Sequence, residues 1–170
     1  PKEQVDRLLA YHIANGGLSR YVKFRYFFEE IRSEAIEEQH ILELAQRFSL
    51  IMRELLINPA LLIRDTMDFV RSNHQKFLMH VTSGSDEQEL KYLCKSLQID
   101  HLFISIHGSP KPKKQWVKEL LVQHGYKPEE CVLIGDSVND WEAANTNGIH
   151  FLAYNSTEEL SALSTIKLMF

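Results

Sequence analysis

One short segment constrains the fold of this chain more than any other. An apolar run at residues 131–134 stops at Gly135, and two carboxylates, Asp136 and Asp140, follow. A short apolar run bounded by a glycine predicts a buried parallel strand. Because open α/β sheets bind ligands beyond the carboxyl ends of their strands, Asp136 is predicted to lie at a binding site. Its oxygens suit Mg²⁺, and Asp140 could hold a metal-bound water.

Strands and helices alternate through the C-terminal two thirds of the chain. The apolar pattern predicts strands over 77–82, 102–106, 132–134 and 149–153, and helices over 61–75, 87–97, 114–124 and 138–147. Repeated strand-helix units predict right-handed crossovers and therefore parallel strands. We expect an α/β fold in which helices flank a parallel sheet.

The first third of the chain is helical instead. Apolar residues recur at helical spacing over 5–13, 18–31 and 41–56. Ser19 could cap the second helix, and Asn58-Pro59 closes the third. These patterns predict a helical-bundle domain over residues 1–58 and an α/β core over residues 59–170.

Composition narrows the possible partners. A chain of 170 residues with 44% apolar residues can form one compact core and a small insert. The net charge of -4 comes without a basic stripe, which argues against nucleic acid as a partner. No apolar run approaches the ~20 residues of a membrane span. Cys94 and Cys131 lack the CxxC spacing of a redox or zinc site and are too few for a disulfide framework, so we expect a reducing cytoplasm. Nothing in the sequence fixes the oligomeric state.

Polar groups also follow two other predicted strands. Thr82, Ser83 and Gly84 form a turn whose hydroxyls and amides can bind phosphoryl oxygens. A lysine-rich run that includes Lys111 and Lys113 follows the next strand, where an ammonium group can neutralise the charge of a transferring phosphoryl group. A hydroxyl, a lysine and a magnesium-binding carboxylate together predict a phosphate site. Taken singly, the serine turn and residues 135–140, called here the Asp136 segment, could also be ordinary helix caps. The lysines could be solvated residues at the start of a helix.

These three segments resemble, in order and separation, the second, third and fourth motifs of the haloacid dehalogenase-like hydrolase superfamily. The helical first third resembles the cap that members related to phosphoglycolate phosphatase insert after their first motif. The resemblance implies a Rossmann-like core and a Mg²⁺-dependent phosphatase of small metabolites that works through an aspartyl-phosphate. In that scheme Ser83 binds the phosphoryl group, Asp136 holds the metal, and either Lys113 or Lys111 stabilises the phosphoryl group, with Lys113 favoured.

The first motif of that superfamily, Asp-x-Asp, does not occur in these 170 residues. It supplies the nucleophile and the general acid, so we expect that segment to lie upstream of Pro1. The alternative is a truncated, noncatalytic relative that binds a ligand or a partner protein through the residual phosphate site. Losing a central parallel strand would also leave two strand edges unpaired.

Basic residues follow the glycine pair at residues 16–17. Arg20 and Lys23 could bind a second anionic group of a substrate if the segment acts as a lid over the site. The competing interpretation is a surface helix with ordinary basic residues.

Overall fold

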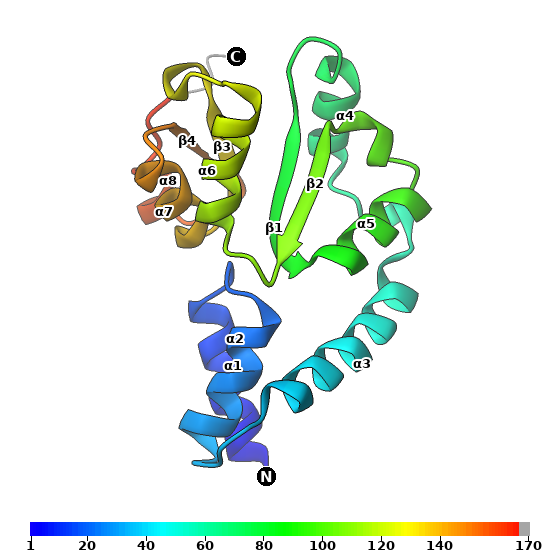
Figure 1. Cartoon of the computed structure of the whole chain (residues 1–170), viewed down its shortest axis with the longest axis vertical. Helices are drawn as coiled ribbons and strands as arrows, with labels where there is room; N and C mark the ends of the chain where they lie inside the picture. The colour runs from blue at the N-terminus through cyan, green and yellow to red at the C-terminus, as the bar shows by residue number, and fades with distance from the viewer. Residues whose placement is uncertain (167–170) are drawn as a thin grey trace. The chain divides into compact units, whose positions relative to one another are not determined.

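A computed structural model describes residues 1–166 of the chain. Its α-helices are α1 (Lys2–Ala14), α2 (Arg20–Tyr26), α3 (Glu38–Leu56), α4 (Arg64–Asn73), α5 (Glu87–Ser96), α6 (Lys113–His124), α7 (Val138–Thr146) and α8 (Glu158–Ser161) (Figure 1). Shorter turns are the π-helix η1 (Phe27–Ile31) and the 3₁₀ turns η2 (Pro59–Leu61), η3 (Asp100–Leu102) and η4 (Pro128–Glu130). Over residues 1–166, no helix combines the length and the apolar character needed to cross a bilayer.

The strands are parallel, as predicted. They are β1 (His80–Asp86), β2 (Ser105–Ser109), β3 (Val132–Gly135) and β4 (His150–Ala153). β1 pairs with β2, and β3 pairs with β4, in both cases in parallel. Within the described residues these pairs form two separate two-stranded sheets rather than the single sheet expected from the alternation. Each pair is joined through a helix, α5 in the first and α7 in the second.

Strands β1 and β2 both begin and end three or four residues later than predicted. β1 begins at His80 because the turn after α4 continues: the Phe77 amide donates to the Asn73 carbonyl over 3.0 Å. β2 begins at Ser105 because residues 100–102 form the 3₁₀ turn η3. Leu102 is buried from that turn, so its apolar character reflects core packing rather than strand pairing.

The chain divides into two compact units, each built around one sheet. The first comprises Pro1–Leu18 together with the chain from Lys111 onward, and the second comprises Ser19–Pro110. This grouping differs from the predicted division into residues 1–58 and 59–170, because contacts gather around each two-stranded sheet. The division into cap and core stays a prediction, and residues 167–170 of that predicted core lie outside the described residues.

Each unit has its own buried core. In the first unit, side chains of α6, α7 and α8 pack with those of β3 and β4, and the buried members are Val117, Leu133, Ala143, Ala144, Ile149, Phe151 and Leu160. In the second unit, α4 and α5 pack with β2 and the η3 region through Met67, Val70, Cys94, Ile99, Leu102 and Ile106. These cores hold the helix starts and strand ends that carry the polar residues of interest.

The second unit also contains α2 and α3, which pack against each other. Ser19 caps α2 as predicted, because its side chain accepts a hydrogen bond from the Val22 amide over 3.5 Å. The rings of Phe24 and Phe48 meet edge to face with centroids 6.3 Å apart. The predicted helix over 18–31 is therefore realised as α2 followed by the π-helix η1.

Candidate functional site

The first unit brings one predicted lysine and one predicted carboxylate together. Lys113, the first residue of α6, donates from Nζ to Oδ1 of Asp140 on α7. The side chains are only 7% and 6% exposed, so this is a buried ion pair. The other oxygen of Asp140 accepts hydrogen bonds from the Ser137 amide (3.1 Å) and hydroxyl (2.6 Å), which caps α7. Asp140 therefore holds Lys113 and also satisfies the Ser137 amide at the start of α7.

Asp136 is placed differently from Asp140. It directly follows β3, is exposed, and makes no hydrogen bond or ion pair with any other residue among 1–166. The preceding Gly135 lies so close to the Asp140 carboxyl group that a Cβ there would collide with it. Position 135 therefore requires a glycine. Because the Asp136 side chain is exposed, its oxygens are available to a ligand.

The donor set fits Mg²⁺ in one respect. Mg²⁺ keeps several waters and is often bound through one or two protein carboxylates plus substrate phosphate oxygens. Asp136 can supply such a carboxylate, whereas both oxygens of Asp140 already have protein partners. Within residues 1–166 no group of three or more His, Cys, Asp or Glu side chains is placed to hold a metal ion. The assignment of Asp136 and Asp140 to a metal site stays a prediction.

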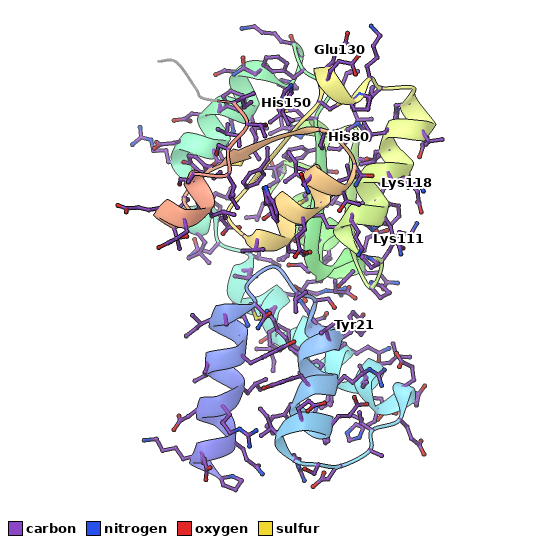
Figure 2. All side chains as sticks on the ribbon, turned by 90° about the vertical axis from the view of Figure 1, so that its left-hand side faces the viewer. Tyr21, His80, Lys111, Lys118, Glu130 and His150 are labelled. Carbon is purple, nitrogen blue, oxygen red and sulfur yellow. The ribbon has the colours of Figure 1, made fainter. Side chains whose placement is uncertain are left out.

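The two candidate lysines have different surroundings. Lys111, which lies just before α6, is labelled in Figure 2. Its Nζ donates to Oε2 of Glu119 over 2.6 Å and lies 3.6 Å from the centroid of the Trp116 ring. Its side chain is 34% exposed, against 7% for Lys113. Only Lys113 is both buried and paired with a residue of the Asp136 segment.

In the second unit the serine turn leaves the strand ladder. Thr82 pairs with His107 across β1 and β2, and the regular register resumes only at Asp86, opposite Ser109. Between these points Ser83 accepts a hydrogen bond at Oγ from the Ser85 amide over 3.1 Å. We call residues 83–85, which include Gly84, the Ser83 turn. Because the Ser83 hydroxyl is used as an acceptor, its proton is available to a ligand.

The two predicted substrate-binding cations of α2 differ in their surroundings: Arg20 is bonded to protein groups, and Lys23 is half-buried. Arg20 donates to both carboxylate oxygens of Glu89, over 2.7 and 2.8 Å, and to Ser49 Oγ over 2.8 Å. With this side chain only 10% exposed, the structure gives Arg20 a protein partner rather than a free face for substrate. Lys23 is half-buried, and this burial lowers the pKa of its ammonium group. Their assignment to substrate stays a prediction.

A histidine pair on the sheet face of the second unit was not predicted as a cluster. His80 Nδ1 lies 2.7 Å and His107 Nε2 lies 2.8 Å from the hydroxyl oxygen of Ser105. His80 is opposite Ser105 in the β1–β2 register, and His107 lies two residues further along β2. The period of two along β2 is the sequence signal that could have grouped Ser105 with His107.

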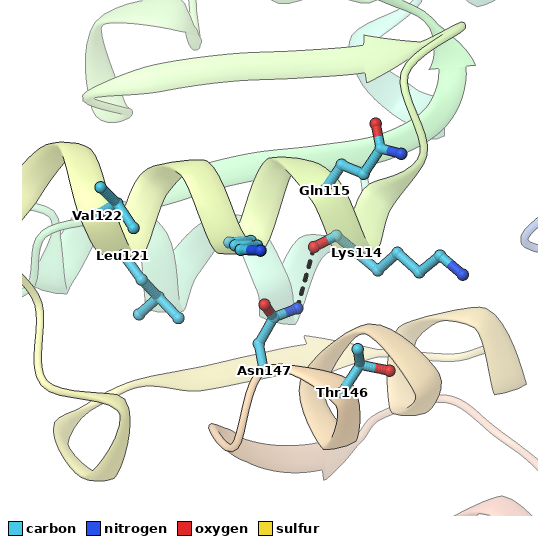
Figure 3. A pocket seen from close by; sticks show the side chains of 7 residues that line it. Lys114, Gln115, Leu121, Val122, Thr146 and Asn147 are labelled. Atoms are coloured by element: carbon cyan, nitrogen blue, oxygen red, sulfur yellow. Dashed lines mark hydrogen bonds between the residues drawn. The ribbon is translucent and has the colours of Figure 1, made fainter.

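A surface pocket of about 470 Å³ lies between α6 and the end of α7. It is lined by polar and apolar side chains, namely Lys114, Gln115, Lys118, Leu121, Val122, Thr146 and Asn147 (Figure 3). The Asn147 amide donates to the Lys114 carbonyl oxygen over 3.0 Å. None of the predicted site residues lines this pocket.

Parallel strands joined through helices, with polar turns at their carboxyl ends, define an α/β protein of the Rossmann-like class. The chain belongs to the haloacid dehalogenase-like hydrolase family, whose model matches residues 12–154. This membership confirms the fold class and family predicted from the sequence.

Related proteins and structures agree with this family. The chain is 29% identical to a phosphoglycolate phosphatase of Aliivibrio fischeri over 108 residues, covering 58% of this chain and 47% of that protein. It is 25% identical to a phosphoglycolate phosphatase of Pasteurella multocida over 154 residues, covering 87% of this chain and 68% of that protein. The chain spans about half the length of the Aliivibrio relative.

Among solved structures, a predicted phosphoglycolate phosphatase from Haemophilus somnus is similar in fold. The TM-score is 0.66 at 20% identity, with 85% of this chain and 71% of that chain covered. A haloacid dehalogenase-like hydrolase from Streptococcus pneumoniae gives a TM-score of 0.55 at 23% identity, covering 74% and 61% of the two chains. At these identities the likeness shows a shared fold and nothing more.

Proposed function

We propose that the protein is a Mg²⁺-dependent phosphatase that hydrolyses small phosphorylated metabolites through an aspartyl-phosphate intermediate. The observation that carries the proposal is the buried Lys113, held by Asp140 beside the exposed Asp136. Family membership supports the same chemistry. The free thiols of Cys94 and Cys131 support our proposal that the reaction takes place in the cytoplasm.

Each residue has one task in this proposal. Ser83 donates its hydroxyl proton to a phosphoryl oxygen, since its oxygen already accepts from Ser85. Lys113 places a positive charge against the oxygens that gain negative charge in the transition state. Asp140 holds the Lys113 ammonium group in place, and Asp136 supplies a carboxylate to Mg²⁺. The bound ion would neutralise phosphate charge and orient the phosphoryl group.

The nucleophile in this proposal is an aspartate outside these 170 residues, because the sequence contains no Asp-x-Asp. Its carboxylate oxygen attacks phosphorus while the bond from phosphorus to the leaving oxygen breaks, and the departing alcohol takes up a proton. Water then hydrolyses the acyl phosphate and releases inorganic phosphate. The competing proposal, a noncatalytic relative, is supported by the same missing motif.

The test is phosphate release by the complete polypeptide from an aryl phosphate and from phosphoglycolate, the latter chosen because relatives carry its name. We expect activity that requires Mg²⁺ and disappears with EDTA. Asp136→Asn should lower kcat/KM by about 10²-fold or more, because the neutral amide binds a divalent cation poorly.

Asp65→Asn is the matched control, since Asp65 is an exposed carboxylate in the first turn of α4. It should leave kcat/KM unchanged. A complete polypeptide that folds and binds phosphate, yet turns over neither compound with Mg²⁺ present, would favour the noncatalytic alternative. Equal activity in Asp136→Asn and Asp65→Asn would refute the assignment of Asp136 to the metal.

A further inference from the structure

We propose that Arg20 and Tyr21 form a clamp that fixes the N-terminal turn of α5 and thereby positions the Ser83 turn. They would act as positioning residues and would not touch substrate. This inference rests on the proposed function, because the Ser83 turn matters to activity only if it binds a phosphoryl group. All residues of the clamp and of the turn lie in the second unit.

The first contact of the clamp is the Arg20–Glu89 ion pair. The two guanidinium nitrogens of Arg20 reach the two carboxylate oxygens of Glu89, and one of them also donates to Ser49 Oγ. The guanidinium carbon lies 4.5 Å from the centroid of the Phe48 ring. Such a bidentate pair fixes direction as well as distance, and at 2% exposure Glu89 has no competing water shell. The start of α2 is therefore fixed to the first turns of α5.

The second contact is made by the neighbouring residue. Tyr21 donates its hydroxyl proton to Oδ2 of Asp86 over 2.7 Å. Oδ1 of the same carboxylate accepts from the Glu89 amide over 3.0 Å and so caps α5. The two oxygens of Asp86 are thus shared between α2 and α5. Losing the Tyr21 hydroxyl would leave the cap in place but free the carboxylate to rotate.

The Ser83 turn is fixed at both ends by these elements. Its N-terminal end follows Thr82, which is held in the ladder opposite His107, and its C-terminal end precedes Asp86, where the ladder resumes opposite Ser109. Close behind Asp86, the Gly108 amide donates to Oε2 of Glu87 over 3.1 Å. Residues 83–85 have no ladder pairing between these points, so the position of the Ser83 hydroxyl depends on Asp86 as well as on Thr82.

A small displacement of this hydroxyl should affect catalysis more than stability. Productive phosphoryl transfer needs reacting groups within a fraction of an ångström of their optimum, and a misplacement of about 1 Å can cost about 10²-fold in rate. A hydrogen bond to a carboxylate also contributes to folding, and its loss alone would lower stability without changing the rate per folded molecule. A role in positioning and a role in stability alone therefore predict different results for the same variant.

Tyr21→Phe in the complete polypeptide is the central experiment, with Tyr92→Phe on α5 as its matched control. Tyr92 is 44% exposed and contacts Arg53 through its ring, which phenylalanine retains. We expect Tyr21→Phe to lower kcat/KM for an aryl phosphate about tenfold and to raise the inhibition constant of inorganic phosphate by a similar factor. The control should change neither. If Tyr21→Phe lowers only the unfolding midpoint and keeps both constants, the clamp has no positioning role.

A second measurement does not depend on turnover. The Ser85 amide is hydrogen-bonded to Ser83 Oγ, so its hydrogen exchange reports the geometry of the turn. Tyr21→Phe and Glu89→Gln should both speed exchange at Ser85, and Tyr92→Phe should not. If the wild-type protein hydrolyses no phosphate ester, the proposed function fails while this exchange experiment still decides on the clamp. Unchanged exchange in both variants would overturn it.

Discussion

Lys113 and Lys111 are two residues apart, yet the structure gives them unequal weight. Removing the Lys113 charge leaves Asp140 buried without a counter-ion, whereas Lys111 has an exposed partner in Glu119. We expect Lys113→Met to lower the free energy of unfolding by about 3–5 kcal/mol. Lys111→Met should lower it by about 1 kcal/mol or less. Urea unfolding of the two variants measures the difference.

A double variant separates charge from packing in this test. Lys113→Met combined with Asp140→Asn removes both charges, and it should recover part of the stability lost in Lys113→Met. If the double variant is less stable than Lys113→Met by the full cost of Asp140→Asn alone, the two side chains are not coupled and the ion pair contributes little.

Tyr21 predicts a stability change in alkaline solution. Burial, followed by its hydrogen bond to Asp86, raises the pKa of Tyr21 to about 12 from 10.0. The folded state therefore holds the phenolic proton more tightly than the unfolded state. The resulting stabilisation is complete below pH 10 and is lost as the pH rises from 10 to 12.

The measurement compares wild type with Tyr21→Phe across that range. Phenylalanine cannot ionise, so the free energy of unfolding should fall less steeply with pH in the variant. Parallel curves for the two proteins between pH 10 and 12 would show that Tyr21 ionises alike in both states.

At the residue scale, local patterns in the sequence point to candidate residues but not to the residues that contact them. Ser83 and Asp136 were chosen because they follow apolar runs, and their roles stay predictions. The partnership of Lys113 with Asp140, 27 residues apart, and of Arg20 with Glu89, 69 residues apart, depends on how distant helices pack. The assignment of Arg20 to substrate stays a prediction, and no local signal in the sequence showed that this cation also pairs with a buried glutamate.

At the scale of elements, the loop between α1 and α2 is more restricted than its glycines suggested. From the sequence, the glycine pair was expected to precede a segment that could act as a lid. In the structure the Asn139 side-chain amide donates to the Gly17 carbonyl oxygen over 2.7 Å. A Cβ on Gly17 would lie 2.5 Å from Ser137 Oγ and 2.6 Å from Asn139 Cβ, whereas one on Gly16 would meet nothing within 4 Å. The loop is thus packed tightly on the start of α7 at one glycine only.

This difference gives a matched pair of variants. Gly17→Ala should destabilise the protein by about 1–3 kcal/mol, since the added methyl group forces side chains of the Asp136 segment to move. Gly16→Ala should be close to neutral. Thermal unfolding compares them, and equal melting temperatures for the two variants would contradict the close approach at Gly17.

Element boundaries show what local patterns can and cannot predict. Helices α5, α6 and α7 lie close to their predicted ranges because each has a capping residue or a proline at its start. The range predicted for β2 began too early because Leu102 and Ile106 are both buried, although Leu102 belongs to a 3₁₀ turn and only Ile106 to the strand. A short apolar run cannot distinguish these two states. The division into two sheets also escaped prediction, because strand pairing is decided by contacts distant in sequence.

At the scale of the whole molecule, two separate cores predict two regions that unfold separately. Phe151, 1% exposed, is central to the core of the first unit, and Ile106 belongs to that of the second. Phe151→Ala should cost about 3–5 kcal/mol. Hydrogen exchange should quicken mainly at amides of α6, α7, β3 and β4, and Ile106→Ala should act mainly on α4, α5 and β2. Uniform acceleration over residues 1–166 by either variant would mean that the two cores unfold as one.

The division of the chain also bears on the order of events during synthesis. The second unit is one continuous stretch, Ser19–Pro110, whereas the first unit joins Pro1–Leu18 to residues that begin at Lys111. During translation, residues 1–18 are synthesised long before the start of α7, against which Gly17 packs. The contact between Gly17 and Asn139 forms only after Asn139, 122 residues later in the chain, has been synthesised. Residues 19–110 can therefore complete their core during translation, while α1 stays undocked until the chain beyond Lys111 has been synthesised.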